Sequence, residues 1–168
     1  MKLAIVGSRD FDDYELVDKL CAHLVERFDV KAIVSGGAKG ADKLGERFAR
    51  QYGLAMIVFK PDWQQFGKRA GYLRNVDIIE ASNIVIAFWD GQSKGTKHSI
   101  DIATKAKKFL IVVNTAKMSI ASLTTGDKIL DISCYGLTSE STVLQLLGSL
   151  NLLTSGLRLS RQGVTYHC

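Results

Sequence analysis

The chain has little of what marks several common classes of protein. Among its 168 residues there is one proline and no low-complexity stretch. It also contains no run of about 18 consecutive apolar residues, so we expect neither a membrane-spanning helix nor a membrane partner. The start, MKLAIVGSRD, has too short an apolar run for a signal peptide, which needs about 7 to 15 such residues.

Patterns of metal ligands and disulfides are missing as well. The three cysteines, Cys21, Cys134 and Cys168, show no CxxC spacing, and the three histidines do not cluster with them. This pattern predicts neither a disulfide framework nor a metal site. A reducing cytoplasm is therefore the expected location, and we expect no cofactor.

No block of like charge stands out either. The net charge is +5 and the basic residues are spread along the chain, whereas proteins that bind nucleic acids usually gather Lys and Arg on one face. The short run KAKK at 105–108 is interpreted as a helix end, where cations complement the helix dipole. Composition favours anionic partners only slightly.

Short apolar runs alternate with segments of helical spacing. The runs predict buried strands at 3–7, 31–37, 55–60, 83–89 and 108–113. The helical spacing predicts helices at 14–28, 41–52, 70–81 and 97–107. This alternation predicts an α/β fold for residues 1–113, Rossmann-like and doubly wound, with a mainly parallel sheet flanked by helices.

Beyond residue 113 the alternation weakens. Residues 138–150 predict a helix, residues 157–167 a hairpin, and leucines between 144 and 153 make this part apolar. We expect residues 114–168 to form a small C-terminal extension packed on the same domain. Three roles stay open for it: adding edge strands to the sheet, covering the site, or forming a dimer surface.

Three loops that follow strand ends are rich in small and polar residues. They are GSRDF at 7–11, SGGAKGAD at 35–42 and WDGQSKGT at 89–96. In an open parallel sheet, loops at the carboxyl ends of the strands line the crevice where ligands bind. Glycines let the backbone approach an anion there, and the first amides of the next helix can hold phosphate. Since SGGAKGAD is neither GxGxxG nor a Walker A loop, a standard dinucleotide or ATP-hydrolysis site is disfavoured.

The candidate ligand-binding residues lie on these loops and on an aromatic, basic segment at 61–75. They are Gly7, Ser8, Arg9, Ser35, Gly36, Gly37, Gly40, Asp62, Trp63, Arg74, Asn75, Asp90, Ser93, Gly95 and Thr96. Thr96 is interpreted either as the cap of the next helix or as a phosphate-binding hydroxyl. Trp63 could stack on a base and Arg74 could clamp a phosphate through two parallel hydrogen bonds. Phe66 is expected instead to pack the segment onto the sheet.

With the motifs IVGSRDF, SGGAKGAD, KPDW with GKRAGYLRN, and WDGQSKGT in this order, residues 1–113 resemble the SLOG superfamily and, within it, the small YspA-like group. The resemblance implies a Rossmann-like fold that binds a nucleotide or a nucleotide-derived small molecule, such as one related to NAD or ADP-ribose. It also implies a homo-oligomer. Related branches include phosphoribohydrolases and DNA-processing proteins, so the superfamily spans enzymes, sensors and DNA binders.

The catalytic glutamate of the phosphoribohydrolase branch has no counterpart, because His98 and Ser99 occupy the corresponding stretch, SKGTKHSID. Asp42, Asp90 or Asp10 could supply a carboxylate in its place. For Asp42 the alternative is a helix N-terminal acid stabilised by the dipole. We therefore expect a nucleotide-binding sensor or sequestering protein first, and an N-glycosidic hydrolase that uses Asp42 or Asp90 second. Single-stranded DNA binding comes third.

Overall fold

The computed structural model describes residues 1–116, 119–125 and 128–130, with side chains described through residue 116. The helix predicted at 138–150, the hairpin predicted at 157–167 and the leucines between 144 and 153 lie outside the described residues. The architecture that follows is therefore that of the SLOG-like part predicted at 1–113, together with two strands that come after it.

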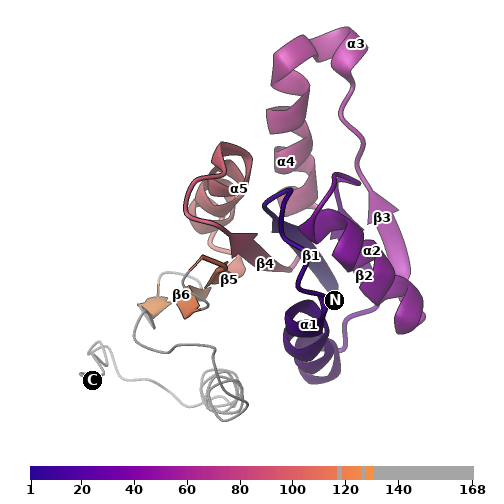
Figure 1. Cartoon of the computed structure of the whole chain (residues 1–168), viewed down its shortest axis with the longest axis vertical. Helices are drawn as coiled ribbons and strands as arrows, with labels where there is room; N and C mark the ends of the chain where they lie inside the picture. Colours follow the sequence, from indigo (N-terminus) through magenta and orange to yellow (C-terminus); the bar gives the residue numbers. More distant parts are fainter. Residues whose placement is uncertain (117–118, 126–127, 131–168) are drawn as a thin grey trace.

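Seven described strands form a single sheet in the order β3-β2-β1-β4-β5-β6-β7 (Figure 1). The parallel strands are β1 (Lys2–Gly7), β2 (Ala32–Ser35), β3 (Ala55–Val58), β4 (Ile84–Trp89) and β5 (Phe109–Asn114). β6 (Ser119–Thr125) and β7 (Lys128–Leu130) continue the sheet in antiparallel fashion next to β5. The predicted α/β fold with a mainly parallel sheet is confirmed. The division into domains at residue 113 stays a prediction.

Helices connect the parallel strands and cover both faces of the sheet. They are α1 (Tyr14–Phe28), α2 (Ala41–Gln51), α3 (Trp63–Phe66), α4 (Ala70–Glu80) and α5 (Lys94–Lys105). α1 and α2 bury one apolar stripe against the face that carries Leu3, Ile5 and Ile86. α4 and α5 pack on the other face, around Val6 and Val85. Each central strand is buried on both faces, which is why it reads as a continuous apolar run.

The strand order reverses between β1 and β4. The chain winds outward from β1 through β2 to β3, then returns to the other side of β1 to form β4 and β5. The loops after β1 and β4 consequently diverge to opposite sides and leave a crevice between them, which is the usual ligand position in open α/β sheets. This is the feature of the fold that positions the site.

Local predictions in two segments, around residues 93–97 and 61–69, differ from the structure. α5 begins at Lys94 rather than at Lys97, because Ser93 caps it: the Ser93 Oγ accepts the Thr96 N–H at 3.4 Å. The interpretation of Thr96 as the cap is therefore wrong. The segment at 61–69, expected to be a loop, contains α3 and a 3₁₀ turn at Gly67–Arg69. The prediction that Phe66 packs onto the sheet is also wrong, since its side chain is exposed.

Candidate functional site

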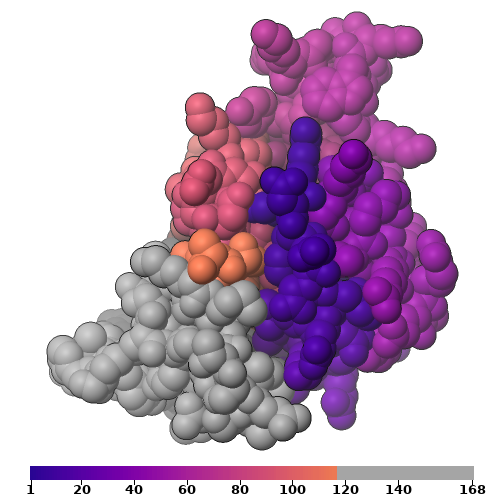
Figure 2. Space-filling model, in the orientation of Figure 1, coloured from indigo at the N-terminus to yellow at the C-terminus, as the bar shows by residue number. Residues whose placement is uncertain are grey.

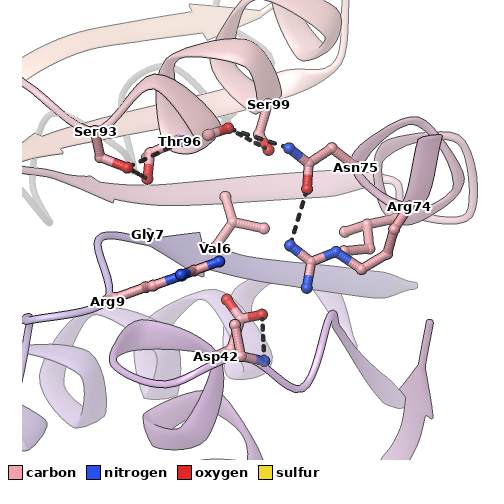
Figure 3. A pocket seen from close by; sticks show the side chains of 12 residues that line it. Val6, Gly7, Arg9, Asp42, Arg74, Asn75, Ser93, Thr96 and Ser99 are labelled. Atoms are coloured by element: carbon pink, nitrogen blue, oxygen red, sulfur yellow. Dashed lines mark hydrogen bonds between the residues drawn. The ribbon is translucent and has the colours of Figure 1, made fainter. Parts of the chain in front are cut away.

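A cleft lies at the reversal point, at the carboxyl ends of β1 and β4 (Figure 3). Its volume is about 80 Å³; since one water molecule needs about 10–15 Å³ by the same measure, a phosphate-sized group fits inside. Larger parts of a ligand would extend beyond the enclosed part. The lining residues are Val6, Gly7, Arg9, Ala38, Asp42, Arg74, Asn75, Ile78, Ser93, Gly95, Thr96 and Ser99.

The first turn of α5 forms one wall of the cleft and offers free backbone donors. Ser93 occupies the N-cap position, and its Oγ also lies 2.9 Å from the Thr96 Oγ1. Among the described residues, the N–H groups of Lys94 and Gly95 have no hydrogen-bond acceptor. A side chain at Gly95 would meet no atom within 4 Å, so the space above this turn is open. Free amides at the positive end of a helix dipole make this wall suited to an anion.

The opposite wall carries a buried carboxylate, that of Asp42 in the first turn of α2. Its Oδ2 accepts the N–H groups of both Gly36 and Ala38 at 3.1 Å. Its Oδ1 has no partner among the described residues, and the side chain points into the cleft (Figure 3). Burial raises the pKa of the Asp42 carboxyl above its ordinary value, although the two amides and the nearby Arg74 guanidinium act in the opposite direction. Asp42 therefore not only lies at the start of α2 but also accepts two amides of the preceding loop and lines the cleft.

The loop that Asp42 holds was the expected phosphate cradle, and the N–H groups of Gly36, Gly37 and Ala38 are already in use. Asp42 takes the Gly36 N–H, and the Ser35 Oγ accepts the Gly37 N–H at 3.1 Å. Neither Gly36, Gly37 nor Gly40 lines the cleft. The Asp42 carboxylate therefore accepts two amides of this loop in the way an anion would, and the α5 turn offers amides that no such group occupies.

Arg74 and Asn75 reach the cleft from α4. The Arg74 Nη1 donates to the Gly36 carbonyl at 3.0 Å, and its Nη2 donates to the Asn75 Oδ1 at 3.2 Å. The Arg74 Nε is buried and has no acceptor in the described part of the chain. Asn75 in turn donates to the Gly95 carbonyl at 3.2 Å and so ties α4 to the first turn of α5. The guanidinium is held in place while a donor remains unused.

Charge in the cleft is positive on balance. Arg9 approaches from the loop after β1 and Arg74 from α4, with the Asp42 carboxylate between them (Figure 3). No ion pair joins these side chains among the described residues. Two guanidinium groups and the end of a helix dipole therefore outweigh a single carboxylate whose ionisation is disfavoured by burial.

Asp90, the other candidate catalytic residue, accepts hydrogen bonds from its own loop. Its Oδ1 accepts the N–H groups of Ser93 at 2.7 Å and Gln92 at 2.8 Å, and these bonds hold the pKa of its carboxyl below the ordinary value. Its own N–H donates to the buried Ser8 Oγ at 3.2 Å. Asp90 does not line the cleft. Asp90 and Ser8 together shape the loop that leads into α5.

The structure brings together eight of the residues singled out in the sequence for ligand binding or catalysis. They are Gly7, Arg9, Asp42, Arg74, Asn75, Ser93, Gly95 and Thr96. Ser8 and Ser35 are buried behind the cleft, and Asp10 does not line it. Asp62 and Trp63 lie on α3 or at its cap, also outside the lining.

Four lining residues were not among the candidates: Val6, Ala38, Ile78 and Ser99. Helical spacing could have indicated two of them, because Ile78 and Ser99 lie one turn after Arg74 and Gly95 and such residues share a helix face. The Ser99 Oγ donates to the Gly95 carbonyl at 3.3 Å. Val6 and Ala38 carried no polar signal, and only the arrangement of the loops places them here.

Two further features bear on chemistry. Within residues 1–116, no group of three or more His, Cys, Asp or Glu side chains is placed to hold a metal ion. Of the helices that the structure describes, none has the length and apolar character needed to cross a bilayer.

Comparison with known proteins gives matches of sequence and of fold. A family model described as the YspA, cpYpsA-related SLOG family matches residues 1–66. The gene 61 protein of Mycobacterium phage D29 is 37% identical over 112 residues, which cover 62% of this chain and 90% of the phage protein. The match to the family model includes the loops after β1 and β2.

Two solved structures share the fold. DNA processing protein A from Helicobacter pylori, described for its single-stranded DNA binding mode, is 20% identical with a TM-score of 0.57, covering 89% of this chain and 80% of its own. DNA processing protein A from Streptococcus pneumoniae is 20% identical with a TM-score of 0.54, covering 66% of this chain and 49% of its own. At this identity the likeness concerns the fold alone.

Proposed function

Because the chain belongs to the YspA, cpYpsA-related SLOG family, we propose that its cleft binds a nucleotide or a nucleotide-derived small molecule, and that the protein acts as a sensor or sequestering protein. The observation that carries the proposal is the first turn of α5. There the N–H groups of Lys94 and Gly95 lack acceptors among the described residues, and the cleft that Gly95 lines also receives Arg9 and Arg74. A phosphate group fits this volume and charge, while ribose and base extend toward the open edge.

Arg74 supports the same proposal from the other side. Its guanidinium is fixed by the Gly36 carbonyl and by Asn75, so little side-chain freedom is lost when a ligand binds. The buried Nε is a donor without an acceptor in the described residues. Leaving such a donor unsatisfied costs about 1–3 kcal/mol, and a ligand oxygen would remove that cost only if the guanidinium shifted to expose the Nε to the cleft.

The test replaces the amide at the first position of α5. Proline is well tolerated at this position because the N–H there has no helical partner, and Ser93 already has an extended backbone with ψ 110°. Lys94→Pro removes the N–H and the charge, whereas Lys94→Ala removes the charge alone. Isothermal titration with AMP, NAD and ADP-ribose measures the difference. We expect Lys94→Pro to bind at least about tenfold more weakly than Lys94→Ala, as loss of a charged hydrogen bond predicts. Equal affinities would contradict the anion site at α5.

A second candidate function, N-glycosidic hydrolysis, is favoured by one observation: the Asp42 Oδ1 is free and faces the cleft. A carboxyl whose pKa is raised by burial suits general acid or base chemistry. Against this, Asp42 is the only carboxylate among the described lining residues, while most glycoside hydrolases use a pair. Binding therefore ranks above hydrolysis.

The two functions separate in one experiment. The protein is incubated with AMP, NAD and ADP-ribose, and the small molecules are then resolved by chromatography. Recovery of intact ligand supports the sensor or sequestering function. Release of free base by the wild type and by Asp90→Asn, but not by Asp42→Asn, would establish a hydrolase that depends on Asp42.

A further inference from the structure

The segment 60–73 forms an arm that projects beyond the sheet. It comprises α3, the 3₁₀ turn at Gly67–Arg69 and the first turn of α4 (Figure 1). α3 packs mainly against that turn and α4 rather than against the sheet. In the space-filling view the arm, in magenta, stands above the other described residues (Figure 2). Its side chains are therefore available to a partner.

Large apolar side chains are concentrated on this arm. Trp63 is 55% exposed, Tyr72 48% and Phe66 44%. With Leu73, they make up four of the seven exposed large hydrophobic residues in the described part of the chain. Trp63 rests on Gly71, whose Cα hydrogen leaves room for the indole: a Cβ there would lie 3.3 Å from the ring. Exposed aromatic residues grouped in this way mark an interaction surface.

The arm also carries cations. Lys60, Lys68 and Arg69 are exposed, and none of them forms an ion pair within the residues that the structure describes. The single acidic residue of the arm, Asp62, uses its carboxylate to accept the Gln65 N–H at 2.9 Å. Because the Asp62 carboxylate caps α3, it does not pair with the cations of the arm. A polyanion would therefore meet three cations that form no ion pair among the described residues.

We infer that the arm binds single-stranded nucleic acid, with bases stacked on Trp63, Phe66 and Tyr72 and phosphates contacting Lys60, Lys68 and Arg69. Aromatic faces accept any base and cations follow the backbone, which is the general mode of binding single strands. A second copy of the chain fits less well, because pairing two arms would bring their uncompensated cations together. The inference does not depend on what occupies the cleft.

The arm and the cleft are joined through α4. Tyr72 meets His98 of α5 edge to face, with ring centroids 4.8 Å apart, and Arg74 enters the cleft two residues later. A strand lying along the arm would therefore pass close to the small-molecule site. Because Tyr72 and Arg74 lie on the same helix, α4, binding of one ligand is expected to change the affinity for the other.

The test measures fluorescence anisotropy of a fluorescein-labelled oligothymidylate of about 12 nucleotides, a length within the range of single-strand sites. We expect Trp63→Ala to weaken binding by about 5- to 150-fold, which corresponds to about 1–3 kcal/mol of stacking. Trp63→Phe keeps an aromatic face and should retain most of the affinity. Circular dichroism verifies that both variants are folded.

Charge is tested by a matched pair of double variants. Lys68→Gln with Arg69→Gln should weaken binding and flatten its salt dependence. The control, Lys2→Gln with Lys105→Gln, removes the same charge from exposed positions at the start of β1 and the end of α5, and it should change neither. With three phosphate contacts, the wild-type slope of log K against log salt is about −2.

Trp63 and Trp89, the two tryptophans of the chain, distinguish the arm from the cleft. Trp89 donates its Nε1–H to the Ser93 carbonyl, beside the cleft. In Trp89→Phe the remaining tryptophan is Trp63, and we expect oligothymidylate to quench its fluorescence. In Trp63→Phe the remaining tryptophan is Trp89, and we expect AMP to change its fluorescence. The inference is overturned if oligothymidylate does not bind or binds equally to Trp63→Ala. It is also overturned if Trp63→Ala instead converts a dimer to a monomer in light scattering, because a second copy would then cover the arm.

Discussion

At Gly40 the loop after β2 lies close against the loop after β1, and replacing this residue tests that contact directly. It caps α2 with φ 73° and ψ −133°, a backbone conformation that residues with a side chain rarely adopt. A Cβ at this position would lie 2.2 Å from the Ser8 carbonyl oxygen and 2.6 Å from that of Arg9. Both are backbone atoms, so neither can rotate away as a side chain would.

Gly67 provides the matched control. Its backbone has nearly the same conformation, with φ 51° and ψ −136°, yet a Cβ there would meet nothing within 4 Å. The strain of placing alanine in such a conformation is about 1–3 kcal/mol at either position. Crowding against fixed atoms adds about 1–3 kcal/mol at Gly40 alone. We therefore expect Gly40→Ala to lower the free energy of unfolding by about 2–6 kcal/mol.

Urea titration followed by circular dichroism measures the free energy of unfolding of wild type, Gly40→Ala and Gly67→Ala. The difference between the two variants isolates the contact between the loops from the backbone strain that they share. If both variants lose the same free energy within about 0.5 kcal/mol, the close approach of Gly40 to Ser8 is refuted. A Gly40→Ala protein that still folds should also bind AMP more weakly, because its Arg9 loop is displaced.

Four further outcomes follow from the cleft and its surroundings. Asp42→Ala should lower the free energy of unfolding by about 2–4 kcal/mol, since two amides lose their acceptor. Asp42→Asn keeps an acceptor and should lose less, and urea titration compares the free energies of unfolding of the two variants. Burial raises the pKa of the Asp42 carboxyl in the folded protein, so this carboxyl ionises at lower pH in the unfolded chain. Wild type should therefore lose stability relative to Asp42→Asn as the pH rises above the ordinary value of 3.8. A wild type that gains stability relative to Asp42→Asn over this range would refute burial as the cause. Ser93→Ala should cost about 1 kcal/mol in thermal unfolding through loss of the α5 cap, and an unchanged midpoint would argue against that cap. Gly36→Ala should weaken AMP binding in isothermal titration, because its Cβ would lie 2.5 Å from the Arg74 Nη1 and displace the guanidinium from its place in the cleft. Full affinity would show that Arg74 is not needed in that position.

Much of the fold could be predicted from the sequence because it depends on local pattern. Helical spacing predicted α1 at Tyr14–Phe28 with the observed bounds. Apolar runs predicted the five parallel strands because buried strands exclude polar residues from both faces. Glycine-rich segments after β1, β2 and β4 predicted which edge carries the site, since parallel strands end at the same edge.

Contacts between distant segments decided the rest. The sequence carries no sign that Asp42 satisfies the amides of its own loop, or that the α5 turn is left with free donors instead, because this follows from the path of residues 36–41 around one carboxylate. Likewise, a phenylalanine such as Phe66 is expected in the core because its side chain is large and apolar. It is exposed because α3 projects away from the sheet. Periodicity fixes which residues face a core, whereas only the tertiary arrangement determines which polar groups remain unpaired.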